Sequence, residues 1–74
     1  MASGPAPGDL IIRNIVNGGF EIAAADGKFL AGPFNSFFAA YERAKVEARK
    51  AEVWQQAIDR RGKPLGLPGR MTAV

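Results

Sequence analysis

The stretch LIIRNIVNGGFEIAAADGKFLA, residues 10–31, decides the fold because it alternates strand-forming runs with tight turns. β-Branched and aromatic side chains are enriched in strands, and alternation along a run indicates one drier face. Asn-Gly and Asp-Gly dipeptides close tight hairpins, because these residues accept positive φ at low cost. The predicted strands are residues 10–16, 20–25 and 28–31, with turns at Asn17-Gly18 and Asp26-Gly27. We therefore expect a three-stranded antiparallel meander.

Downstream of the meander, residues 36–50 (SFFAAYERAKVEARK) contain no glycine or proline and many strong helix formers, and so predict a helix. Asn35 or Ser36 can cap this helix by accepting a bond from an unpaired backbone N–H. Residues 52–58 (EVWQQAI) predict a fourth strand. The expected apolar stripe of the helix consists of Phe37, Tyr41, Ala44 and Ala48. The order β-β-β-α-β predicts an α+β fold, an antiparallel sheet with one helix packed on one face.

The two ends of the chain differ from this middle part in composition. Residues 1–8 (MASGPAPG) lack a large apolar side chain and predict a disordered lead-in, and residues 66–74 predict a flexible tail. Residues 9–65 are then a single α+β domain. The N-terminus lacks the basic region and following apolar stretch that are typical of a signal peptide. No apolar stretch of the sequence approaches the roughly 20 residues of a membrane-spanning helix. A cytoplasmic protein is the expectation.

The absence of cysteine and histidine excludes several kinds of chemistry. Disulfides, thiolate nucleophiles, the common zinc sites and a histidine general base all require one of these residues. Of the two serines, Ser3 lies in the lead-in and Ser36 is best explained as a helix cap. We therefore predict a non-catalytic protein with no cofactor and no metal.

The net charge of +3 is concentrated at the carboxyl end. Residues 1–58 carry six basic and six acidic side chains, and residues 59–74 carry four basic side chains against Asp59. Clustered cations can contact phosphates and add a salt-dependent affinity for nucleic acid, although a solvated, charged turn would look the same. The candidate nucleic-acid contacts are Arg60, Arg61 and Lys63, with Arg13 and Lys28.

The first predicted strand is apolar on both faces, and the single predicted helix can cover only one of them. Twist and the two tails could cover the other face, but an exposed apolar patch usually marks an interface. The candidate self-association face consists of Ile11, Ile15, Ala23 and Ala25, and the alternative is the opposite face of the strand with Leu10, Ile12 and Val16. The leading expectation is an interaction module that forms a homodimer through the open sheet face or an edge strand, and the alternative is a small nucleic-acid-binding domain that uses the basic turn.

The turns of this chain form a pattern that resembles small bacterial domains of unknown function with a hairpin–helix–strand plan. The resemblance covers residues 10–64 and implies the fold, without an activity or catalytic residues. It rests on Asn17-Gly18-Gly19-Phe20, Asp26-Gly27-Lys28, Gly32-Pro33-Phe34-Asn35 and Asp59-Arg60-Arg61-Gly62-Lys63.

The predicted helix start is also similar to that of plant APETALA-type DNA-binding domains. The similarity lies in Phe34-Asn35-Ser36 and in Ala40–Ala44. That resemblance implies a three-stranded sheet that enters the DNA major groove. Base reading would need several arginine and tryptophan residues on the strands, whereas the three predicted strands here offer only Arg13 and Lys28.

Overall fold

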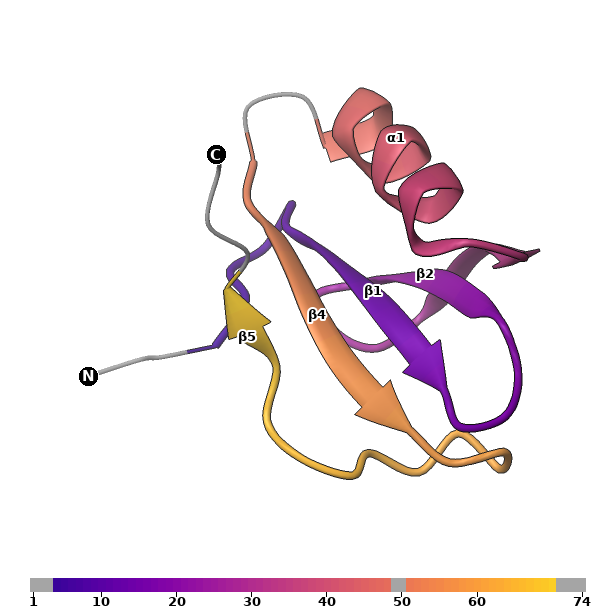
Figure 1. Ribbon diagram of the computed structural model, residues 1–74. Helices are drawn as coiled ribbons and strands as arrows, with labels where there is room; N and C mark the ends of the chain where they lie inside the picture. Colours follow the sequence, from indigo (N-terminus) through magenta and orange to yellow (C-terminus); the bar gives the residue numbers. More distant parts are fainter. Residues whose placement is uncertain (1–3, 49–50, 71–74) are drawn as a thin grey trace.

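The computed structural model describes residues 4–48 and 51–70, and its elements confirm the predicted order β-β-β-α-β (Figure 1). A two-residue strand follows within the stretch predicted as a flexible tail, of which residues 71–74 lie outside the described residues. The elements are β1 Leu10–Ile15, β2 Phe20–Ala24, β3 Phe29–Phe34, α1 Phe37–Ala48, β4 Val53–Ile58 and β5 Gly69–Arg70.

The five strands form one mixed sheet in the order β3-β2-β1-β4-β5. β1 pairs antiparallel with β2, and β2 with β3, as the meander predicts. The prediction of a wholly antiparallel sheet is wrong at β4, which pairs parallel with β1 in the register Leu10 to Val53 through Ile15 to Ile58. The reason is the helix: 12 residues span about 18 Å, close to the length of a six-residue strand. The helix therefore returns the chain to the end of the sheet where β1 begins.

The helix begins where the sequence predicts, and Ser36 is the residue that caps it. The Ser36 hydroxyl oxygen accepts the backbone N–H of Ala39 at 3.1 Å, and the Ser36 carbonyl accepts that of Ala40 at 3.2 Å. The helix is described as far as Ala48, because residues 49 and 50 of the predicted helix lie outside the described residues.

The main core lies between α1 and the covered face of the sheet. Small alanines line the helix side, which lets the helix backbone approach the strands closely, and Ile12 and Ile22 are the largest fully buried side chains. Of the predicted stripe, Ala44 and Ala48 are buried, and Phe37 and Tyr41 pack half-buried at the rim. The core residues are Leu10, Ile12, Ile22, Ala40, Ala44 and Ala48.

Both predicted hairpin turns are present. At the first, Asn17 takes a φ of 56°, and the Ile15 N–H donates to the Gly19 carbonyl at 3.0 Å. At the second, Gly27 takes a φ of 94°, a conformation that glycine adopts without steric cost. These turns fix which residues of β1, β2 and β3 face the helix, because a shift of one residue would exchange the two faces of a strand.

Ahead of β1, residues 6–9 form a turn that is tied to the sheet. The Ala6 N–H donates to the Asp9 carboxylate at 2.9 Å, and the Asp9 N–H donates to the Ala6 carbonyl at the same distance. Residues 1–3 of the predicted lead-in lie outside the described residues. In the described part of the chain, no helix is long and apolar enough to cross a membrane.

Candidate functional site

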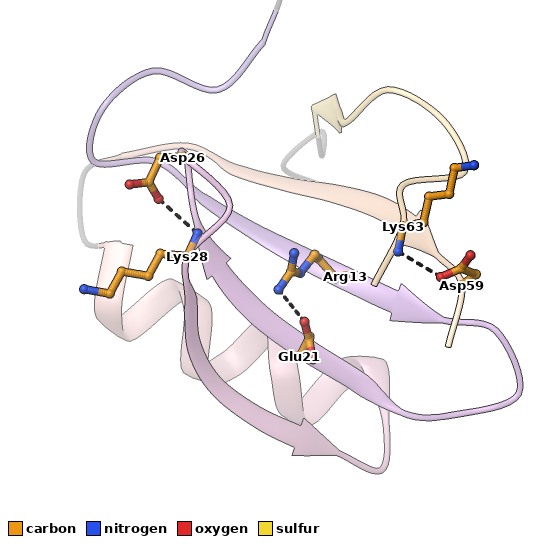
Figure 2. A network of polar contacts seen from close by, with 6 residues as sticks. All are labelled: Arg13, Glu21, Asp26, Lys28, Asp59 and Lys63. Atoms are coloured by element: carbon orange, nitrogen blue, oxygen red, sulfur yellow. Dashed lines mark hydrogen bonds and ion pairs between the residues drawn. The ribbon is translucent and has the colours of Figure 1, made fainter. Parts of the chain in front are cut away.

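The basic turn that follows β4 presents three cations together. Arg60, Arg61 and Lys63 are all exposed. The carboxylate of Asp59 shapes the turn, since its Oδ1 atom accepts the backbone N–H groups of Arg61 and Lys63, each at 2.8 Å. In Figure 2 the Lys63 side chain points away from this carboxylate. The sequence-predicted cluster at residues 60–63 is therefore one exposed surface.

Lys28 is exposed but lies at the opposite end of the sheet. It follows the β2–β3 turn, where the Asp26 carboxylate accepts its backbone N–H at 3.0 Å. This turn lies beside the beginning of β1, because Leu10 pairs with Ala24, whereas the basic turn follows the end of β4. Figure 2 shows the separation of Lys28 from Lys63.

Arg13 also lies apart from the basic turn, in the middle of the sheet face opposite the helix (Figure 2). Its guanidinium lies 2.5 Å from the carboxylate of Glu21, its cross-strand partner on β2. The two side chains are only 16% and 18% exposed. A cation held by a neighbouring carboxylate has little charge left for a phosphate, so the structure brings together three of the five predicted basic contacts.

The candidate self-association face lies where the sequence places it, opposite the helix. Ile11 pairs with Ala23, while the neighbours of Ile11, Leu10 and Ile12, belong to the core. However, Ile11 is 4% exposed and Ala23 0% exposed within the single folded chain, contrary to the prediction of an open apolar patch. Ile15 and Ala25, the other two residues of that face, are half-buried.

Large neighbours explain why Ile11 and Ala23 are covered. Trp54 lies beside Ile11 in the parallel register, and Phe29 lies beside Ala23 on β3. Trp54 is itself 6% exposed, and its indole N–H donates to the Asp9 carboxylate at 3.0 Å. Bulky side chains on either side shield smaller ones from water, so Ile11 and Ala23 are buried although no helix covers this face.

The carboxyl-terminal segment pairs along the edge of β4 that does not face β1. Ile58 forms an isolated bridge with Pro64, and the Leu65 N–H donates to the Ala57 carbonyl at 2.9 Å. The Gln56 amide donates to the Gly66 carbonyl at 2.7 Å. Since Gln56 pairs with Arg13 and shares its face, this bond holds the Gly66 carbonyl over the face opposite the helix.

A surface that the sequence did not single out is the outer edge of β3. β3 ends the sheet, so within the described residues its outer edge pairs with no strand. Phe29 is 51% and Leu30 49% exposed there. The sequence of β3, FLAGPF, has no charged residue, and this absence of charge could have indicated the exposed edge. Natural edge strands are usually protected by charges, prolines or bulges, and here Pro33 and two register shifts interrupt β3, one of the shifts lying between Phe29 and Ala31.

Two hollows of the described surface have a defined lining. One of about 200 Å³ lies on the helix side, beside the edge-to-face pair of Phe20 and Phe37, whose ring centres are 5.8 Å apart. Another of about 510 Å³ lies beside the basic turn, between Val16 and Leu65. Among the described residues no group of three acidic, histidine or cysteine side chains could hold a metal ion.

A comparison of the chain with protein-family models, with curated proteins and with solved structures found no match. The arrangement is that of an α+β domain with one helix on a mixed sheet.

Proposed function

We propose that this domain is a non-catalytic interaction module that self-associates through the outer edge of β3. The observation that supports the proposal is the pair Phe29 and Leu30, which are half exposed on an edge that pairs with no strand in the described sheet. An edge strand offers a row of backbone donors and acceptors to another strand, and exposed apolar side chains beside it add buried area.

A second copy of the chain is the partner that suits this edge. An antiparallel pair across this edge brings the exposed Phe29 and Leu30 of one copy beside those of the other. No charged residue lies within β3 to oppose its own copy. Pro33 has no N–H to donate, and this limits the pairing to the first part of the strand. A chain of this size gains from association, because its own core is thin.

The test is the solution mass of the chain measured by light scattering over a range of concentrations. We expect the wild type to reach twice the mass of one chain, and Leu30→Lys to stay folded and remain at the mass of one chain. Val46→Lys is the matched control, because Val46 is 70% exposed on α1, away from the edge, and should keep the dimer. A wild type that stays monomeric at every concentration, or a Leu30→Lys variant that dimerises like the control, would contradict the proposal.

Nucleic-acid binding is a second candidate function, favoured by the exposure of Arg60, Arg61 and Lys63 on one turn. Three phosphate contacts predict an affinity that falls about 20- to 40-fold between about 50 and 200 mM salt. We expect Arg60→Ala with Arg61→Ala to weaken the binding of a labelled oligonucleotide, measured by fluorescence anisotropy. Lys28→Ala is the control, because Lys28 lies at the other end of the sheet. Binding that is insensitive to salt, or that Lys28→Ala weakens as much as the double variant, would refute this candidate.

A further inference from the structure

The parallel pair of β1 and β4 leaves a shallow, open hollow at one end of the sheet. Both strands end there, because Ile15 pairs with Ile58. The chain then leaves β1 toward β2 on one side and leaves β4 toward β5 on the other (Figure 1). Where neighbouring parallel strands send their connections in opposite directions, a space remains between the two turns, and ligands of open sheets bind in such places.

A hollow of about 510 Å³ is found at this position. It is bounded by the turn after β1 and the turn after β4, which are tied together by the Val16 N–H donating to the Ile58 carbonyl at 3.0 Å. The residues that line it are Val16, Asn17, Asp59, Arg60, Arg61 and Leu65.

The lining combines positive charge with apolar surface. Arg60 and Arg61 supply two guanidinium groups, which pair with phosphate oxygens in bidentate fashion. Asp59 is the one carboxylate in the lining, and its Oδ1 atom is occupied by the N–H groups of Arg61 and Lys63. Val16 and Leu65, which are 42% and 56% exposed, supply the apolar walls.

We propose that this hollow binds a phosphate monoester carried on a planar or apolar body, that is, one nucleotide unit. The phosphate contacts Arg60 and Arg61, and the body packs against Val16 and Leu65. This inference rests on the nucleic-acid candidate and gives it a site. Two ligands present such a group, a free mononucleotide and the phosphorylated end of a nucleic-acid strand, and the experiment distinguishes between them.

The first arm is a titration of the ¹⁵N-labelled full chain, followed by amide chemical shifts, with adenosine monophosphate, with inorganic phosphate and with succinate as a carboxylate control. We expect shifts in residues 16–19 and 59–65, and binding about tenfold weaker in Arg60→Ala with Arg61→Ala. Leu65→Ala should weaken the mononucleotide about threefold and leave inorganic phosphate unchanged. Its matched control is Leu67→Ala, since Leu67 is 90% exposed and outside the hollow.

Three results of the first arm would overturn the proposal. One is a set of shifts spread over Lys28 and the other exposed cations, without a centre at the two turns. Another is an equal effect of Leu65→Ala and Leu67→Ala on the mononucleotide. The third is succinate binding as tightly as phosphate, because the site would then be a general anion site.

The second arm compares one oligonucleotide with and without a 5′-phosphate. Tighter binding of the phosphorylated strand, lost in Leu65→Ala, supports the strand end as the source. Mononucleotide binding without oligonucleotide binding supports the hollow and refutes the nucleic-acid function. Oligonucleotide binding that survives Leu65→Ala and shifts no amide in residues 16–19 refutes the hollow and leaves the nucleic-acid function standing.

Discussion

The indole N–H of Trp54 donates a hydrogen bond of 3.0 Å to the carboxylate of Asp9, a residue 45 positions away in the chain. The same carboxylate accepts the backbone N–H of Glu52 at 3.1 Å and that of Ala6 at 2.9 Å. Asp9 is only 8% exposed. One side chain therefore joins the segment before β1 to the entry of β4.

Asp9→Ala is expected to lower the free energy of unfolding by about 2–3 kcal/mol, because the buried indole N–H of Trp54 and two part-buried backbone N–H groups lose their carboxylate acceptor. Urea unfolding followed by the fluorescence of Trp54, the one tryptophan in the chain, measures the change. Asp26→Ala is the control, since the Asp26 carboxylate accepts the exposed Lys28 N–H, and should cost under about 1 kcal/mol. Equal costs for the two variants would mean that Asp9 does not join the two segments.

The local elements of this fold could be predicted from the sequence because each depends on neighbouring residues. The positive φ of Asn17, the turn at Gly27 and the cap at Ser36 are short-range effects. The direction of β4 is different, because EVWQQAI alternates in the same way whether its neighbour is parallel or antiparallel. It follows from the length and path of the helix, which no local pattern encodes.

The candidate sites likewise differ in whether they depend on neighbouring or on distant residues. The cluster of Arg60, Arg61 and Lys63 is contiguous in sequence and could be predicted. The burial of Ile11 depends on Trp54, 43 residues later, and so could not. The contact of the basic turn with Val16 likewise exists only because β1 and β4 are parallel.

Ala44 lies in the core between α1 and the sheet, and it is 0% exposed. Ala44→Leu should destabilise the fold by about 1–3 kcal/mol, because a larger side chain forces the helix away from Ile12 and Ile22. Ala39→Leu is the matched control on the exposed side of the helix and should be near neutral. Thermal unfolding followed by circular dichroism distinguishes the two, and a neutral Ala44→Leu would show that the helix can shift without cost.

Gly19 is required by a close approach of two backbones. A Cβ atom at this position would lie 2.3 Å from the Phe34 carbonyl oxygen, at the pairing of β2 with the end of β3. Gly19→Ala should therefore cost about 1–3 kcal/mol. At Gly66 a Cβ atom would meet nothing within 4 Å, so Gly66→Ala should leave the urea midpoint unchanged. If Gly19→Ala also leaves the midpoint unchanged, the two strands do not approach this closely.

The Arg13–Glu21 pair should contribute more to stability than the second ion pair of the described chain, Arg43–Glu47. Arg13 and Glu21 are 16% and 18% exposed, whereas Arg43 and Glu47, one turn apart on α1, are 51% and 53% exposed. Removing one partner of a desolvated pair leaves an uncompensated charge, whereas an exposed pair is screened by water and salt. Double-mutant cycles on the free energy of unfolding compare the two pairs directly.

For the cross-strand pair, we expect a coupling energy of about 1–3 kcal/mol, with Glu21→Leu alone more destabilising than Glu21→Leu combined with Arg13→Met. For the helix pair, we expect about 0.3–0.5 kcal/mol, decreasing as salt is added. Equal coupling energies in the two cycles would mean that water reaches Arg13 and Glu21 freely, and that the face opposite the helix opens in solution. In that case Ile11 and Ala23 would again be candidates for an interface.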